Sequence, residues 1–312
     1  MNYVLIIIGF ILLIYGANLL VDGSTGLAKR LKVSDLIIGL TIVAFGTSAP
    51  ELVVNLVAVG KHGSTDIALT NIIGSNMINT YIVLGMAALI FPIASQKSSR
   101  RLDIPLSIIA PILVLVLTIN DVLEMREGMV LMIFFLWFLY STIKNAIRFP
   151  EKLVVESYKA MSIWKSVLFI LGGLVILVIG AHMIVPAAVN VATNLGVSQD
   201  VIGLTIVALG TSLPELATSV VAAFKRNSDI ALGNVVGSNI LNVFFILATS
   251  AMVKPLPTYP SIKMDLIVTL IGSLLIIIFI YLNKERAIQR WSGALFLILY
   301  TVFISLRIAT II

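Results

Sequence analysis

The sequence predicts an all-α integral membrane protein with ten transmembrane helices in two inverted five-helix repeats. Three observations predict this fold: the composition, a series of apolar runs, and a motif that occurs twice. Hydrophobic residues make up 59% of the 312 residues and charged residues 12%, and the mean hydropathy is +1.10. A soluble globule cannot shelter so much apolar surface from water, so we expect the chain to lie in a lipid bilayer.

Ten apolar runs are long enough to be spans, since a helix needs about 20 apolar residues to cross the hydrocarbon core. Glycine and asparagine interrupt the third and the eighth of these runs. The predicted spans are 3–27, 35–60, 66–93, 103–120, 127–147, 165–190, 199–224, 229–253, 263–282 and 291–310.

A repeated motif divides the chain into two halves. The segment Ile38–Glu51, which reads IGLTIVAFGTSAPE, returns as IGLTIVALGTSLPE at Ile202–Glu215. The separation between the two copies maps the first span onto the sixth, so each half holds five spans. An odd number of crossings forces the second half to be inserted upside down relative to the first. The expected organisation is repeat 1 over 1–150 with its motif region at 38–79, a short cytoplasmic linker over 151–164, and repeat 2 over 165–312 with its motif region at 202–242.

Lysine and arginine are distributed unequally between alternate loops, which predicts the orientation. The poorer side carries five of the 21, namely Lys61, Arg126, Lys254, Lys263 and Arg307. By the positive-inside rule the richer side faces the cytoplasm, so both termini are expected outside a plasma membrane. The sixteen on the richer side are Lys29, Arg30, Lys32, Lys97, Arg100, Arg101, Lys144, Arg148, Lys152, Lys159, Lys165, Lys225, Arg226, Lys284, Arg286 and Arg290.

Composition also excludes several functions. The chain has no cysteine, which excludes disulfides, thiolate metal sites and cysteine nucleophiles. The net charge of +6 comes from short loops between spans, so it orients the chain and does not indicate nucleic-acid binding. No span contains a nucleophile beside a base. We therefore expect a transporter without a cofactor, whose surroundings are the lipid bilayer and transported ions, with no obligatory protein partner.

Each repeated motif combines a helix-breaking proline with a carboxylate inside an apolar span. A charge at that depth costs about 2.5–3.5 kcal/mol on insertion scales, so Glu51 and Glu215 are candidate functional residues. The proline lacks an amide hydrogen, so the helix should break and free backbone carbonyls. The first copy then gathers the carbonyls near Ala44 and Thr47 with the side-chain oxygens of Thr47, Ser48 and Glu51, and the second copy supplies Ala208, Thr211, Ser212 and Glu215.

A second repeated motif follows each first one, at Asn71–Asn79 and at Asn234–Asn242. Each places a serine and an asparagine four residues apart on one helical face, so the pairs Ser75 with Asn79 and Ser238 with Asn242 are expected to complete an oxygen shell. Hard oxygen donors without histidine or sulfur suit sodium, calcium or magnesium, and calcium tolerates an irregular cage best.

Purely structural roles for the motif residues stay open as alternatives to ion binding. Small residues often serve only to let membrane helices pack closely, which we favour for Gly39, Gly74, Gly203 and Gly237. The asparagines at 71, 76, 234 and 239 could bind ions or could link helices by hydrogen bonds. The aspartates at 22, 66, 200 and 229 lie near span ends, where we interpret them as interfacial or capping residues.

These motifs resemble those of the calcium/cation antiporter superfamily, specifically its sodium/calcium exchanger branch, over almost the whole chain. The proton/calcium branch typically carries a Gly-Asn-Ala-like stretch before its glutamate, which this sequence lacks. Some relatives have aspartate where Asn242 stands, so this site has two carboxylates. The ligands that the resemblance implies are Ala44, Thr47, Ser48, Glu51, Ser75, Asn79, Ala208, Thr211, Ser212, Glu215, Ser238 and Asn242.

The resemblance implies an antiporter that uses sodium influx to expel calcium by alternating access. One calcium ion or two sodium ions neutralise the two glutamates, so the family's three-for-one exchange is expected to be electrogenic. The first and sixth spans are expected to slide over a fixed core, with Gly16, Gly172, Gly173 and Gly180 easing that movement. The alternatives are a proton/calcium exchanger of the same fold and, more remotely, a cation channel.

Overall fold

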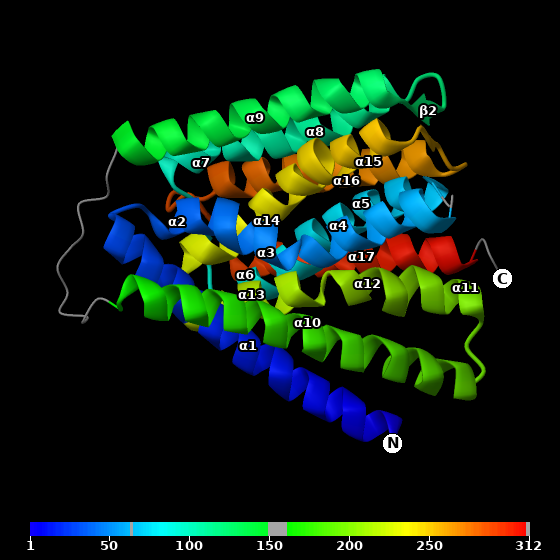
Figure 1. The fold of residues 1–312 in the computed structure, drawn as a ribbon, viewed down its shortest axis with the longest axis horizontal. Coiled ribbons are helices and arrows are strands. Elements are labelled where there is room, and N and C mark those ends of the chain that lie inside the picture. Colours follow the sequence, from blue (N-terminus) through cyan, green and yellow to red (C-terminus); the bar gives the residue numbers. More distant parts are fainter. Residues whose placement is uncertain (63–64, 149–160, 310–312) are drawn as a thin grey trace.

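The computed structural model describes residues 1–62, 65–148 and 161–309, and in these residues ten helical segments follow the ten predicted spans (Figure 1). Eight of them are long and apolar enough to cross a membrane, and a ninth is a pair of helices bent by 65°. The continuous helices are α1 (Asn2–Leu31), α8 (Asp103–Leu117), α9 (Met125–Arg148), α10 (Ile163–Asn194), α16 (Ile262–Leu282) and α17 (Arg290–Ala309).

The other four segments are interrupted, as the glycines, prolines and asparagines in them indicate. The second contains α2 (Asp35–Ile38), the π-helical turn η1 (Gly39–Val43), α3 (Ala44–Thr47), α4 (Ala49–Val57) and η2 (Ala58–His62); the third contains α5 (Thr65–Ile78), η3 (Asn79–Val83) and α6 (Leu84–Ile90). The seventh contains α11 (Gln199–Ile202), η4 (Gly203–Val207), α12 (Ala208–Thr211) and α13 (Leu213–Phe224); the eighth contains α14 (Ser228–Leu241), η5 (Asn242–Leu247) and α15 (Ala248–Val253).

Two predicted boundaries need correction. The fourth span was expected over 103–120, but α8 has 15 residues, because Thr118 bonds back to the carbonyl of Val114 and the amide of Asp121 closes a turn on Thr118. The linker was expected over 151–164, but α10 begins at Ile163, after Ser162, whose hydroxyl caps the helix by accepting the amide of Lys165. The rest of that linker, 151–160, lies outside the described residues.

Two short sheets show the inverted relation of the halves. Strand β1 (Ile93–Ala94) pairs with β4 (Ala287–Ile288), and β2 (Val122–Leu123) pairs with β3 (Leu256–Pro257), both antiparallel. β1 follows the third span and β3 the eighth, while β2 follows the fourth span and β4 the ninth. The symmetry that relates the two repeats therefore maps β1 onto β3 and β4 onto β2, so it maps one sheet onto the other. Each sheet joins one strand from each half, so the two halves are interlocked.

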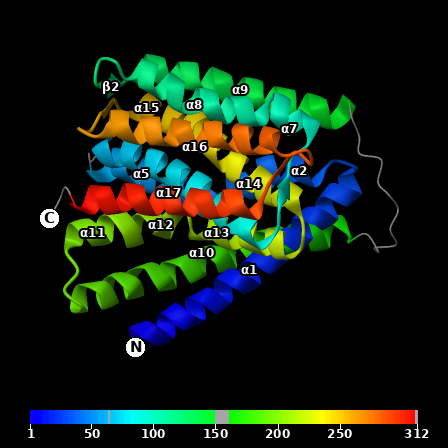
Figure 2. The same cartoon turned by 180° about the vertical axis from the view of Figure 1, so that it is seen from behind.

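Helices α1 and α10 pack against each other along one long edge of the molecule, with α8 and α9 along the opposite edge (Figures 1 and 2). A methyl group on Gly16 would lie 2.8 Å from the carbonyl oxygen of Gly173, and one on Gly9 would lie 2.9 Å from that of Gly180. Gly172 has no neighbour within 4 Å at this position. Apart from Gly172, the glycines expected to ease sliding over the core lie at the contact between α1 and α10.

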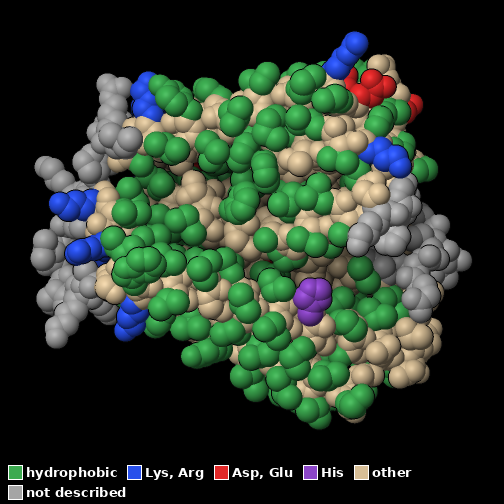
Figure 3. Space-filling view, viewed as in Figure 1, with side chains coloured by type: hydrophobic (Ala, Val, Ile, Leu, Met, Phe, Trp, Pro, Cys, Tyr) green, Lys and Arg blue, Asp and Glu red, His purple; other side chains and the backbone are tan. Residues whose placement is uncertain are grey.

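The outer surface is apolar between two ends of different charge. Exposed side chains such as Ile11, Ile133 and Leu168 cover the flanks, as a lipid environment requires (Figure 3). The end formed by the C-terminus of α1, α2 and the short helix α7 (Lys97–Arg101) carries a cluster of lysine and arginine; we call it the basic end (Figure 3). Helix α1 begins and α17 ends at the opposite, far end (Figure 1).

Candidate cation site

Two spans break at a serine in the middle of the molecule. Helix α3 ends just before Ser48 and α12 just before Ser212. These serines have backbone angles of φ −84°, ψ 6° and φ −88°, ψ 6°, which do not continue a helix. Pro50 and Pro214 lie in the first turn of the helices that follow, where the missing amide hydrogen has no intrahelical acceptor to lose. The proline therefore fixes the position of each break, as the sequence predicted.

Each break brings a glutamate to the first turn of the next helix. Glu51 lies in the first turn of α4 and Glu215 in the first turn of α13, and both side chains are fully buried. The Ser48 hydroxyl donates to Oε1 of Glu215 at 3.0 Å, and the Ser75 hydroxyl donates to Oε1 of Glu51 at 3.4 Å. The Ser48 bond crosses between the repeats, so the two copies of the motif form one polar centre. Helix N-termini also favour negative charge.

Six buried oxygens of the predicted ligands have no hydrogen-bond partner in this structure. Leaving a buried polar atom unpaired costs about 1–3 kcal/mol, so six of them call for a shared partner. Their helices meet, because η3 contacts α13 and α14, and η5 contacts α4 and α5. The six are Oε2 of Glu51 and Glu215, Oγ of Ser212 and Ser238, and Oδ1 of Asn79 and Asn242.

This donor set fits a hard cation. It consists of carboxylate, hydroxyl and amide oxygens, the ligands that calcium and sodium accept in irregular numbers. Among the described residues, no three side chains of histidine, cysteine, aspartate or glutamate gather at one place. The centre therefore pairs two negative charges with neutral oxygens.

The two threonines of the motifs take different positions. The Thr47 hydroxyl lies 3.3 Å from the carbonyl oxygen of Ala44 and 3.0 Å from Oδ1 of Asn234, so it already has partners. The Thr211 hydroxyl lies 3.5 Å from that of Ser75, next to Glu51. The structure thus places Thr211 beside Ser75, whose hydroxyl donates to Glu51, and ties the Thr47 side chain to α14.

The backbone carbonyls that the breaks were expected to free also differ. The Ala44 carbonyl accepts the amide of Ser48 at 3.0 Å, so it stays within the hydrogen-bonding pattern of its helix. In the second copy the amide of Ser212 turns to Gly210, away from Ala208. Ala208 lines a separate cavity of about 220 Å³ that reaches Arg307 at the far end.

A chain of hydrogen bonds through three other residues holds Asn242 in place. The Asn242 amide nitrogen donates to Oδ1 of Asn76 at 2.9 Å, Asn76 donates to the Asn239 carbonyl at 3.1 Å, and Asn239 donates to the Thr80 hydroxyl at 2.9 Å. Because its nitrogen is engaged, Asn242 has its oxygen left for an ion. The helix-linking interpretation is confirmed for Asn76 and Asn239, and sequence reasoning missed Thr80, which lies one helical turn after Asn76.

A second set of amides supports the glutamate helices. Asn234 donates to the Glu215 carbonyl at 3.2 Å and to the Ser219 hydroxyl at 2.9 Å, while Asn71 donates to Oδ1 of Asn55 at 2.8 Å. Asn55 and Ser219 were missed by sequence reasoning. Each lies four residues after a glutamate, and that spacing is the signal that could have found them.

The two halves of the site are closed to different degrees. A methyl group on Gly237 would lie 2.8 Å from Cβ of Ala44, so α14 packs tightly on α3, and Gly39 is similarly close to α14. Gly74, the equivalent of Gly237, has nothing within 4 Å and lines the cavity beside Ala208. Close packing is confirmed for Gly237 and Gly39, and it is wrong for Gly74 in this structure. The surroundings of Gly203 lie outside what the structure describes.

The family model described as "Sodium/calcium exchanger protein" matches residues 1–144 and 165–309. The chain belongs to the sodium/calcium exchanger family. The exchanger is similar to a solved structure of the sodium-calcium exchanger NCX_Mj, with a TM-score of 0.83 and 35% identity over 97% of this chain and 98% of that one. It is 37% identical to an uncharacterised membrane protein of Methanocaldococcus jannaschii, over 96% of this chain and 95% of the relative.

A named relative extends this similarity. The sodium/calcium exchanger MaX1 of Methanosarcina acetivorans is 31% identical, with 97% of each chain covered. The family, the solved fold and the buried oxygens agree that this chain is a membrane antiporter of calcium and other cations and not an enzyme. The ten-helix, inverted-repeat fold predicted from the sequence is confirmed.

Proposed function

We propose that this exchanger moves sodium and calcium in opposite directions across a plasma membrane by alternating access. The observation that carries the proposal is a set of six unpartnered buried oxygens, two of them on the carboxylates of Glu51 and Glu215, on helices that contact one another. The names of NCX_Mj and MaX1 support sodium as the coupling ion. The proposed ligands are Ala44, Thr47, Ser48, Glu51, Ser75, Asn79, Ala208, Thr211, Ser212, Glu215, Ser238 and Asn242.

The charge of the site supports electrogenic exchange. Glu51 and Glu215 are both fully buried, so their charge must be balanced when the site is closed. One calcium ion brings the total to zero, whereas three sodium ions bring it to plus one. In a three-for-one exchange the sodium-loaded form therefore carries the net charge across the membrane.

The asymmetry of the two halves supports alternating access. The half around Gly237 is packed and the half around Gly74 is open to a cavity. Because the repeats are inverted, exchanging these two arrangements closes one end of the molecule and opens the other. We also propose repeats at 1–150 and 165–312, a linker at 151–164, and a cytoplasmic basic end.

Flux into proteoliposomes tests the function. Vesicles loaded with sodium and diluted into sodium-free buffer with radioactive calcium should accumulate calcium. A positive-inside potential set with potassium and valinomycin should speed the uptake, because each cycle of three sodium ions out and one calcium ion in moves one net positive charge outward. Uptake driven by a proton gradient with no sodium present would replace our proposal with proton/calcium exchange. Calcium flux that needs no counter-ion would indicate a channel.

A further inference from the structure

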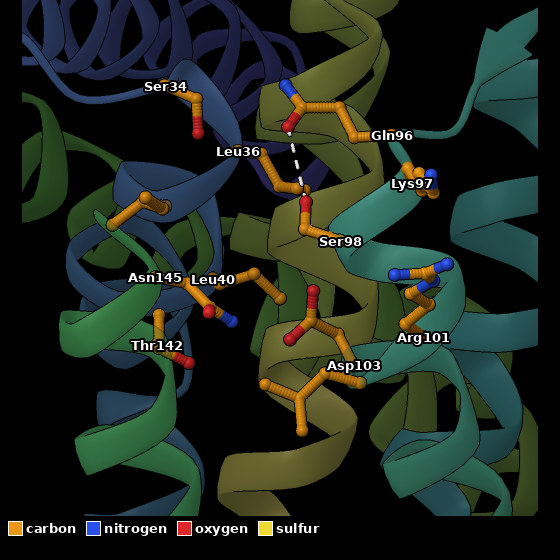
Figure 4. A pocket seen from close by; sticks show the side chains of 12 residues that line it. Ser34, Leu36, Leu40, Gln96, Lys97, Ser98, Arg101, Asp103, Thr142 and Asn145 are labelled. Carbon is orange, nitrogen blue, oxygen red and sulfur yellow. Dashed lines mark hydrogen bonds between the residues drawn. The ribbon is translucent and has the colours of Figure 1, made fainter. Parts of the chain in front are cut away.

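A second polar cavity lies at the basic end, apart from the cation site. It has a volume of about 540 Å³ and lies between α2, α7, α8 and α9 (Figure 4). Leu36 and Leu40 contribute apolar walls, while Lys97 and Arg101 are exposed at its edge. A cavity with both charged and apolar walls at the end of a transmembrane bundle lies where lipid head groups lie.

Asp103 is a buried acid in this cavity without a cationic partner from the protein. Its side chain is 3% exposed, and no lysine, arginine or histidine among the described residues lies within 4.0 Å of its carboxylate. Figure 4 shows Asp103 and Asn145 pointing into the cavity from different walls. Thr142 also lines the cavity. This residue is 3% exposed, and its hydroxyl has no hydrogen-bond partner.

The second repeat shows what a partner for this acid looks like. Asp103 lies in the first turn of α8, and Asp265 lies in the first turn of α16, the matching helix of the second repeat. Oδ1 of Asp265 lies 3.0 Å from Nη1 of Arg307 in α17. Gly128 of α9 and Gly293 of α17 occupy equivalent places, each packed closely on the late half of the third or eighth span.

This equivalence identifies the residue that replaces the arginine. Fourteen residues after Gly293 comes Arg307, and fourteen residues after Gly128 comes Thr142. The first repeat therefore keeps the acid of the pair and replaces its cation by a short, unpartnered hydroxyl. A buried carboxylate without a paired charge is costly, and either a proton or a bound cation removes that cost. The cavity beside Asp103 leaves room for the second.

Lys97 and Arg101 indicate a second charge on the same molecule. They line the cavity, yet neither forms an ion pair with Asp103. Lysine and arginine at such a position bind phosphate, arginine in bidentate geometry. A ligand that suits both walls carries a phosphate at one end and a hydrogen-bonding cation at the other.

We propose that this cavity binds the head group of a phospholipid with a primary ammonium, of the phosphatidylethanolamine type. The ammonium bonds to Asp103, with Thr142 and Asn145 as further partners, and the phosphate bonds to Lys97 and Arg101. The apolar walls of Leu36 and Leu40 meet the start of the acyl chains. The lipid cation completes in the first repeat the ion pair that Arg307 completes in the second.

Native mass spectrometry of the purified full chain, titrated with short-chain lipids, tests this assignment. Dihexanoyl phosphatidylethanolamine should bind at least tenfold more tightly than dihexanoyl phosphatidylcholine, because the trimethylated ammonium of the latter donates no hydrogen bonds. Asp103→Asn should remove this preference. Thr142→Arg, which installs the cation of the second repeat, should also weaken phosphatidylethanolamine binding at least tenfold while the chain stays folded. Asp121→Asn, at an exposed acid at the far end, is the matched control and should bind as the wild type does.

Three outcomes would overturn the assignment. Equal binding of both lipids by the wild type would exclude recognition of the ammonium. Retained preference in both Asp103→Asn and Thr142→Arg would place the lipid elsewhere. Free phosphoethanolamine or inorganic phosphate that binds as tightly as the lipid would make the occupant a soluble anion. Loss of binding in Lys97→Ala/Arg101→Ala for both lipids alike would support the phosphate contact, and unchanged binding there would contradict it.

Discussion

Glu51 and Glu215 provide the negative charge of the proposed site, so the variants Glu51→Gln and Glu215→Gln test it. Glutamine keeps the size of the side chain but leaves a calcium ion with one uncompensated positive charge in a buried place. Sodium-driven calcium uptake should therefore fall by roughly 100-fold or more in either variant. Glu124→Gln, at an exposed glutamate of the far end, serves as the control. Near-normal exchange by Glu51→Gln would remove that carboxylate from the site.

Asn242 sets the charge of the site at minus two, and Asn242→Asp should move the charged step of the cycle. With three carboxylates the calcium-loaded form carries minus one and the form with three sodium ions is neutral. Calcium-for-calcium exchange, measured with radioactive calcium at clamped potentials, should be independent of voltage in the wild type and dependent on it in the variant. Asn242→Ala is the control and should stay voltage-independent. A voltage-dependent wild type would contradict the two-carboxylate site.

At the scale of residues, spacing along one helix was sufficient to predict the unpartnered oxygens. Ser238 in the last turn of α14 and Asn242 at the start of η5 lie four residues apart in one continuous helical segment, so the sequence predicted their shared face. The amide chain from Asn242 through Asn76 and Asn239 to Thr80 could not be predicted, because it depends on which faces of α5 and α14 meet. Helical periodicity describes one helix at a time, and such partners come from two.

At the scale of elements, two neighbouring glycines of α10 have different surroundings. A methyl group on Gly173 would lie 2.7 Å from the carbonyl oxygen of Gly16 in α1, whereas Gly172 has no neighbour within 4 Å. Gly173→Ala should therefore destabilise the protein by about 1–3 kcal/mol. Gly172→Ala should be neutral or stabilise it by up to about 1 kcal/mol through helix propensity. Thermal unfolding in one detergent compares them, and equal effects would contradict tight α1–α10 packing.

Gly74 and Gly237 are equivalent residues in unequal surroundings, and their alanine variants should shift the protein in opposite directions. Alanine at 237 would collide with Ala44, so Gly237→Ala should disfavour the observed arrangement, while Gly74→Ala fits it and blocks closure of α12 on α5. Nitroxide labels at Ile67→Cys and Val207→Cys, two exposed positions on α5 and η4, report the α5–η4 distance.

The distance distributions have a specific expected pattern. Gly74→Ala should show only the long distance, and Gly237→Ala should gain a shorter one. Both variants should also slow exchange, because each hinders one of the two arrangements. Identical distributions in the two variants would show that these glycines do not separate the two arrangements.

The breaks in the second and seventh spans could be predicted, since Pro50 and Pro214 remove a helical donor wherever the chain goes. The sheets β1–β4 and β2–β3 could not. Each strand has two residues and forms only when a loop of the other half lies beside it, so no local pattern indicates it. The same reason hides the open cavity beside Gly74, because the sequences of the two copies are nearly identical in this region.

At the scale of the whole molecule, the inverted repeat and the charge distribution together predict one orientation in the membrane. The β1–β4 loop region lies at the basic end, and the loop before α9 belongs to the far end, where β2 pairs with β3 (Figure 1). The positive-inside rule places the basic end in the cytoplasm. The Asp103 cavity would then bind lipids of the inner leaflet.

Single cysteines test this orientation sharply, because the natural chain has no cysteine to label. Glu124→Cys reports the far end and Lys284→Cys the basic end, and both positions are exposed. A membrane-impermeant maleimide added to intact cells should label Glu124→Cys and leave Lys284→Cys unmodified until the membrane is permeabilised. The reverse pattern would place both termini in the cytoplasm. It would also move the cavity beside Ala208 to the cytoplasmic side, so calcium would then reach the open half of the site from inside the cell.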